Sequence, residues 1–336
     1  MSRIVVGLAP AATLLGALAA GCTTEGEKTA VSPRTVTVTT TKTVEATPPP
    51  FSVPEQLFPP YEPPAEERYR NGKRLAARVA QNLATFAPGA SPVDLARSVG
   101  LDATGGLAPL LDPSRRSAGE VVYVQLSGTT ATTLGTMVVV RQHLENGDGE
   151  EETVVRVMDI RLRRTDGAWS LDRVASVGGS PVPRPEQLSA AAARVLDHPA
   201  IELPDTVRWD IHRGKVNDAL LRALADAADR WPLALTVLST GHPSRVWATP
   251  RTSAHTVGFA ADIYAVGGEL VVRQRQRGSK AYRLAEALLA GGAAQVGSPW
   301  VLPPGGRRSF TDVVHEDHVH VQRSSAAPRD SLTVGG

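Results

Sequence analysis

Apolar residues in the first half of the chain recur with the spacing of a helix followed by strands. From Glu66, an apolar stripe at intervals of three and four residues predicts a helix, which Pro88 and Gly89 end. The stripe consists of Leu75, Val79, Leu83 and Phe86. Runs rich in Val and Ile predict four strands, at residues 120–126, 134–144, 153–164 and 169–177. Because Asp166-Gly167 is typical of a tight hairpin turn, we expect a curled antiparallel sheet and an α+β fold for residues 66–180.

A turn-rich stretch at residues 178–185 marks the end of this region and predicts a domain boundary. We interpret residues 181–204 as a linker with a helix near residues 186–196. Beyond the linker, the apolar pattern predicts a helix at 215–230, a buried strand at 233–238 and a short helix at 280–289. We therefore expect a second domain at residues 205–328, followed by a tail at residues 329–336.

The chain begins with the pattern of an export signal. Arg3 supplies a positive start, and residues 4–20 contain no charged side chain. The sequence Leu18-Ala19-Ala20-Gly21-Cys22 resembles the lipobox of bacterial lipoproteins, in which the cysteine is diacylated and becomes the first residue of the mature protein. This resemblance implies a signal peptide at residues 1–21 and a lipid anchor at Cys22. We expect an exported protein held at the outer face of the cell membrane.

Residues 22–65 are rich in Thr and Pro and contain few large apolar side chains. Such a segment cannot bury enough surface to offset the entropy lost on ordering. The composition therefore predicts a disordered tether between the lipid anchor and the folded domains.

Charge and cysteine content exclude two classes of protein. The 36 Lys and Arg residues nearly balance the 34 Asp and Glu residues, which gives a net charge of +2. We therefore expect no nucleic-acid partner, because such binding needs a basic excess gathered on one face. Cys22 is the sole cysteine, so a framework of disulfides within the chain is also excluded.

Two histidine motifs lie in the second domain. The first is Ser253-Ala254-His255-Thr256-Val257-Gly258-Phe259-Ala260-Ala261-Asp262, and the second is His315-Glu316-Asp317-His318-Val319-His320. They resemble the paired S-x-H-x-x-G-x-A-x-D and H-x-D-H-x-H signatures of the VanY-like D-alanyl-D-alanine carboxypeptidases, which are zinc peptidases with a hedgehog-type fold. The resemblance covers about residues 205–323.

The residues of these motifs also fit a catalytic zinc site on their own chemistry. Such a zinc takes three protein ligands from His and carboxylate and leaves a fourth position for water. His255, Asp262 and His320 supply this set, for one zinc per chain. The small residues Gly258 and Ala260 allow a loop to turn tightly into a strand beside the metal. Strand alternation then places Asp262 on the face opposite an apolar underside.

The resemblance implies roles for other residues of the two motifs. Asp317, three positions before His320, stands where the family has its carboxylate base, and His315 resembles the histidine that stabilises the oxyanion. His318 would share a face with His320 in a regular strand. Three roles are therefore open to His318: it orients His320, it carries a second proton, or it is the metal ligand in place of His320. We expect Ser253 to be a hydrogen-bonding neighbour of the ligands rather than a nucleophile.

Substrate-binding residues are less clearly marked. Many relatives carry a Gly-Tyr-Arg before the first motif, whereas this chain has Ser239-Thr240-Gly241-His242-Pro243-Ser244-Arg245 there. Arg245 and Arg251 are candidates for a bidentate carboxylate clamp, and His242 is a candidate for a hydrogen bond to substrate. The basic stretch at residues 273–277 is either a solvated loop or a contact with an anionic polymer or substrate peptide.

The sequence thus predicts an exported lipoprotein with a zinc metallopeptidase domain that hydrolyses amide bonds of peptidoglycan stem peptides, as a carboxypeptidase or an endopeptidase. The alternative is a zinc-containing lipoprotein of the same fold that binds the cell wall or a protein without cutting it. Residues 166–174 of the first domain resemble the last strand of nuclear-transport-factor-like domains. No cluster of titratable residues stands out in the sequence of residues 66–180, which favours a docking or spacer role for them.

Overall fold

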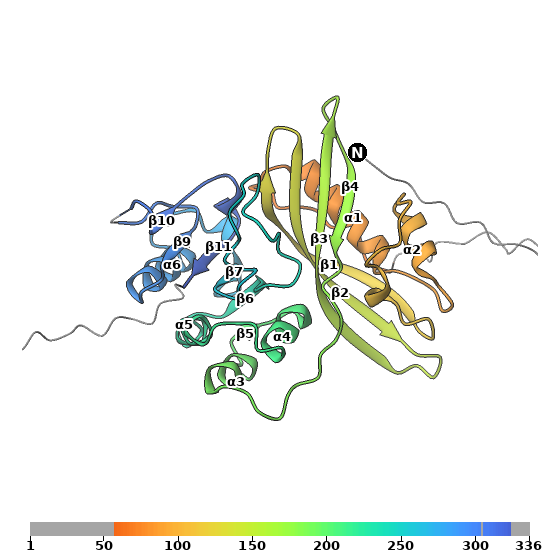
Figure 1. The fold of residues 1–336 in the computed structure, drawn as a ribbon. Helices are drawn as coiled ribbons and strands as arrows, with labels where there is room; N and C mark the ends of the chain where they lie inside the picture. The colour runs from red at the N-terminus through yellow and green to blue at the C-terminus, as the bar shows by residue number, and fades with distance from the viewer. Residues whose placement is uncertain (1–56, 304, 324–336) are drawn as a thin grey trace, which may run out of the picture. The chain divides into compact units, whose positions relative to one another are not determined.

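The computed structural model of the chain describes residues 57–303 and 305–323. The predicted signal peptide, the lipid anchor at Cys22, most of the predicted tether and the tail at residues 329–336 lie outside the described residues. The described residues belong to one compact unit and contain two β-sheets (Figure 1). Within them, no helix combines the length and the apolar character needed to cross a membrane.

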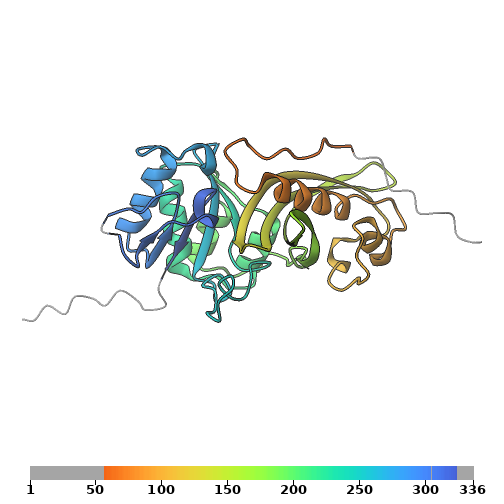
Figure 2. The same cartoon turned by 90° about the horizontal axis from the view of Figure 1, so that it is seen from above.

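The first sheet is an antiparallel meander in the order β1-β2-β3-β4. Helix α1 contacts all four strands. In Figure 2 this helix, in orange, lies across one face of the sheet. The four predicted strands are confirmed, although the first begins earlier than expected because its first residues pair with the end of the second. The elements are α1 (Arg70–Leu83), α2 (Pro92–Ser98), the 3-10 helix η1 (Ala108–Leu110), β1 (Arg116–Thr129), β2 (Thr133–Glu145), β3 (Glu151–Thr165) and β4 (Ala168–Ser176).

The observed first helix is shorter than the predicted one. It ends at Leu83 because Phe86, the last residue of the apolar stripe, forms a β-bridge with Ser117 at the edge of the sheet. Helix α2 follows a capping box that the periodicity did not reveal: the Ser91 hydroxyl accepts a hydrogen bond from the Asp94 amide, and the Asp94 carboxylate accepts one from the Ser91 amide.

Residues 57–65, which the composition assigns to the tether, lie against the first sheet. The ring of Phe58 stacks on His143 with ring centroids 4.7 Å apart, and Tyr61 packs against the core beneath α1. Glu62 forms ion pairs with Arg70 and Arg74 of α1. The last nine residues of the predicted tether are therefore part of the described fold.

The second sheet has the order β10-β9-β11-β7-β6-β5, with β8 paired to β7. Helices α5 and α6 pack against it around a large apolar core. Helix α5 is shorter than the predicted helix because the Asn217 side chain accepts hydrogen bonds from two amides and caps it. The elements are α3 (Ala190–Leu196), β5 (Ile201–Glu202), α4 (Asp205–His212), α5 (Asp218–Ala228), β6 (Leu233–Val237), β7 (Ala260–Val266), β8 (Glu269–Leu270), η2 (Val271–Arg273), α6 (Lys280–Ala290), β9 (Gln295–Gly297), β10 (Ser309–Phe310), η3 (Val314–Glu316) and β11 (Val319–Gln322).

The predicted α+β class is confirmed. The described residues form a mixed α+β fold with six α-helices and sheets of four and seven strands. Short strands such as β5, β8 and β10 have only two residues each, so no periodic pattern could reveal them.

Strand β1 presents its two faces to different cores. Val124 and Leu126 belong to the core beneath α1, whereas Tyr123 packs in a separate cluster with Val237 of β6 and Tyr264 of β7. Because successive side chains of a strand alternate between its faces, Gln125 shares the face of Tyr123. A buried amide of the first sheet is therefore directed toward β6 and β7 of the second.

Candidate metal centre

Strands β7 and β11 bring the two motifs together. His320 of β11 is the register partner of Asp262 on β7, so their side chains lie side by side on one face. The opposite face of these strands carries apolar side chains of the second core: Ala261, Ile263, Val319 and Val321. The predicted placement of Asp262 over an apolar underside is confirmed, and the pairing explains how residues 58 positions apart meet.

His255 lies in the loop before β7 and is held in one orientation. Its Nδ1 donates to the backbone oxygen of Leu238 at 2.8 Å, because a carbonyl oxygen can only accept. Nδ1 therefore carries a proton, and Nε2 is the nitrogen that faces the other site residues and could bind a metal. The Ser253 hydroxyl accepts from the His255 amide at 3.3 Å, in keeping with the predicted role of a hydrogen-bonding neighbour.

Gly258 is required by backbone crowding in this loop. It has a positive φ of 76°, and a Cβ there would lie 1.8 Å from the backbone oxygen of Lys215. The sequence predicts a small residue here, but the close approach is to the Lys215 backbone rather than to a metal. Gly258 thus fixes the path of the chain between His255 and Asp262.

Three potential ligand atoms lie close together in this arrangement. His255 Nε2 is 3.2 Å from Asp262 Oδ1 and 3.2 Å from His320 Nδ1, and His320 Nδ1 is 2.9 Å from Asp262 Oδ1. Ligand atoms about 2.0–2.1 Å from a tetrahedral zinc lie about 3.3 Å from one another. The three atoms are therefore spaced like one face of such a coordination sphere.

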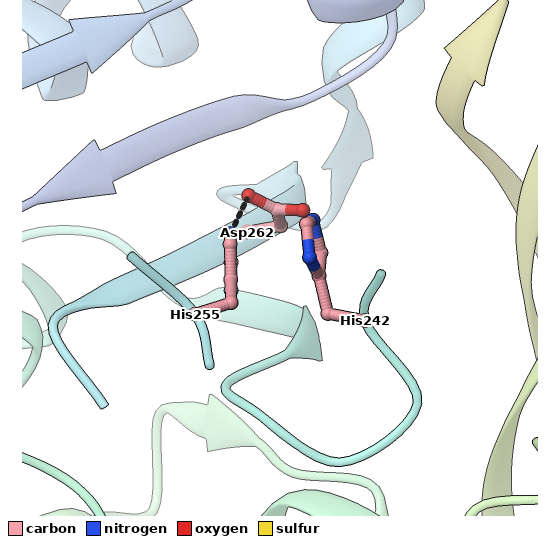
Figure 3. Close-up of side chains that lie close together, drawn as sticks. All are labelled: His242, His255 and Asp262. Atoms are coloured by element: carbon pink, nitrogen blue, oxygen red, sulfur yellow. Dashed lines mark ion pairs between the residues drawn. The ribbon is translucent and has the colours of Figure 1, made fainter. Parts of the chain in front are cut away.

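His242 lies beside His255 and Asp262, as Figure 3 shows. One of its ring nitrogens lies within 4.8 Å of ligand atoms of His255 and Asp262, so these three residues form a group that could hold a metal ion. Its ring stacks on that of His255, with centroids 3.9 Å apart and an angle of 14° between the planes. His242 Nδ1 donates to the Pro243 backbone oxygen at 3.0 Å, which leaves Nε2 as the free nitrogen.

His318 and Asp317 form a buried pair at the edge of the site. His318 Nδ1 lies 2.7 Å from Asp317 Oδ1, and His318 Nε2 lies 3.7 Å from Asp262 Oδ2. Burial opposes the charged imidazolium, but the carboxylates of Asp262 and Asp317 raise the pKa of His318 above its ordinary value. His318 thus stands between the ligand carboxylate and the carboxylate that the sequence assigns as the base.

The second oxygen of Asp317 is held by the first sheet and its helix. Asp317 Oδ2 accepts hydrogen bonds from Lys73 Nζ at 2.7 Å and from the Leu126 amide at 2.9 Å. Lys73 also forms an ion pair with Glu67, and both side chains are fully buried. Burial disfavours the ionised carboxyl, but Lys73 and His318 together lower the pKa of Asp317. Asp317 is therefore an ionised, fully hydrogen-bonded carboxylate.

His315 lies at the more open side of the cluster. Its Nδ1 is 2.7 Å from Asp312 Oδ1, and its ring centroid lies 5.7 Å from that of His320. His315 and His320 keep 16% and 13% of their side chains exposed, against 1% for His255. Because His242 is also half-buried, three histidines of the cluster, His242, His315 and His320, reach the solvent.

The candidate substrate-binding arginines lie on the surface of the loop between β6 and β7. Arg245 and Arg251 are exposed, and within the described residues neither guanidinium forms a hydrogen bond or ion pair with the cluster. In the basic stretch at residues 273–277, Arg275 forms an ion pair with Glu316 at 3.3 Å and donates to the backbone oxygen of Glu66. At least Arg275 therefore holds parts of the chain together rather than pointing freely into solvent.

Lys73 and Gln125 are the site neighbours that sequence patterns did not single out. Lys73 lies on the same helical stripe as the buried residues Ala76 and Ala80, so a lysine within the apolar face of α1 was the available signal. Gln125 is a polar residue in the middle of a strand that is otherwise apolar at its centre. Both signals mark burial, but neither identifies the partner.

Comparisons of the chain with protein-family models, with curated proteins and with solved structures found no match.

Proposed function

We propose that this protein is a zinc-dependent peptidase of the cell envelope that hydrolyses amide bonds of peptidoglycan stem peptides. The spacing of His255 Nε2, Asp262 Oδ1 and His320 Nδ1, each within 3.2 Å of the other two, carries the proposal. The proposal also includes a hedgehog-type fold for residues 205–328, as the motifs imply. Export and anchoring through a lipid on Cys22 would place the enzyme next to this substrate.

His320 is a better third ligand than His242 in the observed conformation. An imidazole nitrogen binds a metal through a lone pair in the plane of the ring. Because His242 and His255 stack nearly parallel at 3.9 Å, their nitrogens cannot both aim at one ion between them. The His320 ring is tilted by 54° to that of His255, and its Nδ1 lies at the shared position. His242 remains free to contact substrate.

When bound by this set, zinc would polarise the scissile carbonyl and lower the pKa of a bound water to about 7. The donor set fits zinc, which takes neutral imidazole and carboxylate ligands in tetrahedral sites. Burial, opposed by Asp262, lowers the pKa of His320 to about 4, so its ring is neutral at physiological pH as a ligand must be.

We assign proton transfer to the pair of His318 and Asp317 rather than to Asp317 alone. Within the described residues, the Asp317 carboxylate accepts hydrogen bonds from Lys73, Leu126 and His318. It forms no hydrogen bond with His255, Asp262 or His320. His318 Nε2 faces Asp262, so His318 is the member of the pair nearer the reaction. Asp317 would hold the proton of His318 on Nδ1 and orient the ring.

His315 is placed to donate a hydrogen bond to the developing oxyanion from the open side of the cluster. Its Nδ1 bond to Asp312 fixes the ring and leaves Nε2 for substrate.

The experiment that tests this function is mass spectrometry of cell-wall fragments incubated with the purified, zinc-loaded protein. The substrates are a disaccharide pentapeptide ending in D-alanyl-D-alanine and a cross-linked dimer of stem peptides. We expect loss of an alanine or opening of the cross-link by the wild type and by His198→Ala. The His198 side chain is 11% exposed, and it contacts Asp229 and the Ala200 amide rather than any residue of the cluster. We expect no product from His320→Ala.

A second candidate is a zinc-containing lipoprotein that binds cell-wall peptide without cutting it. The observation that favours it is the close covering of the cluster by Gln125 and His242. Unchanged masses of both substrates, together with zinc bound at one per chain, would favour this second function.

A further inference from the structure

A side chain of the first sheet contacts the candidate metal ligand of the second. Gln125 Nε2 of β1 lies 2.8 Å from Asp262 Oδ2. Gln125 has no exposed surface, and Asp262 retains 2% of its surface. The bond joins residues 137 positions apart, and it lies on the oxygen of Asp262 that does not face His255 and His320.

The orientation of the Gln125 amide is fixed by its two partners. An ionised carboxylate can only accept, so the group facing Asp262 must be the NH₂ end of the amide. The oxygen end accepts a hydrogen bond from the Thr236 hydroxyl of β6, another residue without exposed surface. The chain Thr236 to Gln125 to Asp262 is therefore directional, with each member donating to the next.

The two oxygens of the Asp262 carboxylate have different neighbours. Oδ2 is occupied by Gln125, whereas Oδ1 lies at 2.9 Å and 3.2 Å from the nitrogens of His320 and His255. A carboxylate held in this way presents one oxygen to a metal in a fixed direction and cannot rotate its plane. Hydrogen-bond partners of this kind typically change metal affinity by about 10- to 100-fold.

We infer that Gln125 is a positioning residue for the metal ligand Asp262, and that the first sheet is therefore a structural part of the metal centre. The inference rests on the proposed metal site but not on hydrolysis. It assigns to residues 66–180 a role other than docking or spacing: they complete the coordination site of the second sheet.

The test is titration of the purified, metal-free protein with Zn²⁺ and with Co²⁺, whose visible absorption reports the geometry of its ligands. We expect Gln125→Leu to bind both ions about 10- to 100-fold more weakly than the wild type, with an altered Co²⁺ spectrum. Thr236→Val removes the hydroxyl that orients the Gln125 amide, while the Gln125 side chain itself is retained. It should cause a smaller loss of affinity, and it is the second variant should Gln125→Leu fail to fold.

Gln142→Leu is the matched control. Gln142 is also fully buried in the first sheet, but its side chain bonds to Leu110 and Arg156 rather than to the cluster. We expect this variant to retain the metal affinity and the Co²⁺ spectrum of the wild type. Wild-type affinity in Gln125→Leu, or an equal loss in Gln142→Leu, would overturn the inference.

The outcomes also separate this inference from the proposed function. A wild type that binds zinc but cuts no peptide would refute the peptidase and leave the role of Gln125 standing. A wild type that binds neither ion would refute the metal centre and this inference together. Weaker binding by Gln125→Leu with hydrolysis by the wild type would support both.

Discussion

Lys73 Nζ lies 2.7 Å from Asp317 Oδ2, although 244 positions separate the two residues along the chain. Neither side chain is exposed beyond 1%, and the buried Glu67 carboxylate shares the same lysine. Two buried carboxylates thus depend on one cation that α1 supplies. Because a buried charge without a partner is costly, this contact couples the folding of the first sheet and its helix to the order of the histidine-rich segment.

Replacing Lys73 should therefore destabilise the whole unit. We expect Lys73→Met to lower the free energy of unfolding by about 3–5 kcal/mol, because it removes the buried cation that the Glu67 and Asp317 carboxylates share. Urea unfolding followed by circular dichroism measures the change. Lys215→Met, at an exposed lysine, should stay within about 0.5 kcal/mol of the wild type. The double variant Lys73→Met/Asp317→Asn should lose less than the sum of its single changes, and simple additivity would argue against the coupling.

Zinc should stabilise the fold through the three proposed ligands. A ligand that binds only the folded state adds about 2.7 kcal/mol at 100 times its dissociation constant. We expect chelation to lower the melting temperature of the wild type and added zinc to restore it. In His320→Ala the melting temperature should respond little to either treatment. A full response in that variant would mean that His242, rather than His320, completes the ligand set with His255 and Asp262.

Trp247 anchors the loop that carries His242, because its indole packs over two glycines of the first sheet. Gly128 and Gly135 are register partners on β1 and β2, and a Cβ at either would lie 2.2 to 2.6 Å from the Trp247 indole. Arg161 covers the same ring, with its guanidinium carbon 5.5 Å from the ring centroid. Because neither glycine has a side chain, the Trp247 indole packs directly on the backbone of the sheet.

A side chain at Gly128 should displace Trp247 and make the loop that carries His242 more mobile. We expect Gly128→Ala to cost about 1–3 kcal/mol through overpacking and to increase amide hydrogen exchange across residues 239–252. Gly147→Ala is the control, since a Cβ at Gly147 meets no atom within 4 Å. Equal exchange rates in the two variants would show that Trp247 does not anchor the loop.

The local sequence pattern predicted the strand that carries Asp262, but it did not predict the contacts that the first sheet and α1 make with the cluster. The alternation around Asp262 and the spacing of the second motif depend on neighbours within a few residues, and both faces of β7 agree with that prediction. The hydrogen bond from Gln125 and the ion pair from Lys73 depend instead on how the two sheets pack. No periodicity of either strand or helix encodes a partner more than 100 positions away. Asp210 of α4 accepts hydrogen bonds from the amides of Ser239 and Thr240 and so fixes the start of the His242 loop, and this contact, 29 and 30 positions along the chain, also lies beyond the reach of a local pattern.

Asp312 should give the fold a dependence on acid pH. Burial opposes its charged form, but hydrogen bonds from His315 and from the Val314 amide lower the pKa of Asp312 from 3.8 to about 2. A carboxyl with a lowered folded-state pKa stabilises the fold above its unfolded-state value, and this contribution is lost as the pH falls through the folded-state value. Asp312→Asn should therefore lower the unfolding free energy above about pH 4, and the difference should shrink toward pH 2. Because Asp312 is 49% exposed, we expect less than about 1 kcal/mol. Urea unfolding of both proteins from pH 7 to pH 2 measures it, and a difference that stays constant with pH would contradict the assignment.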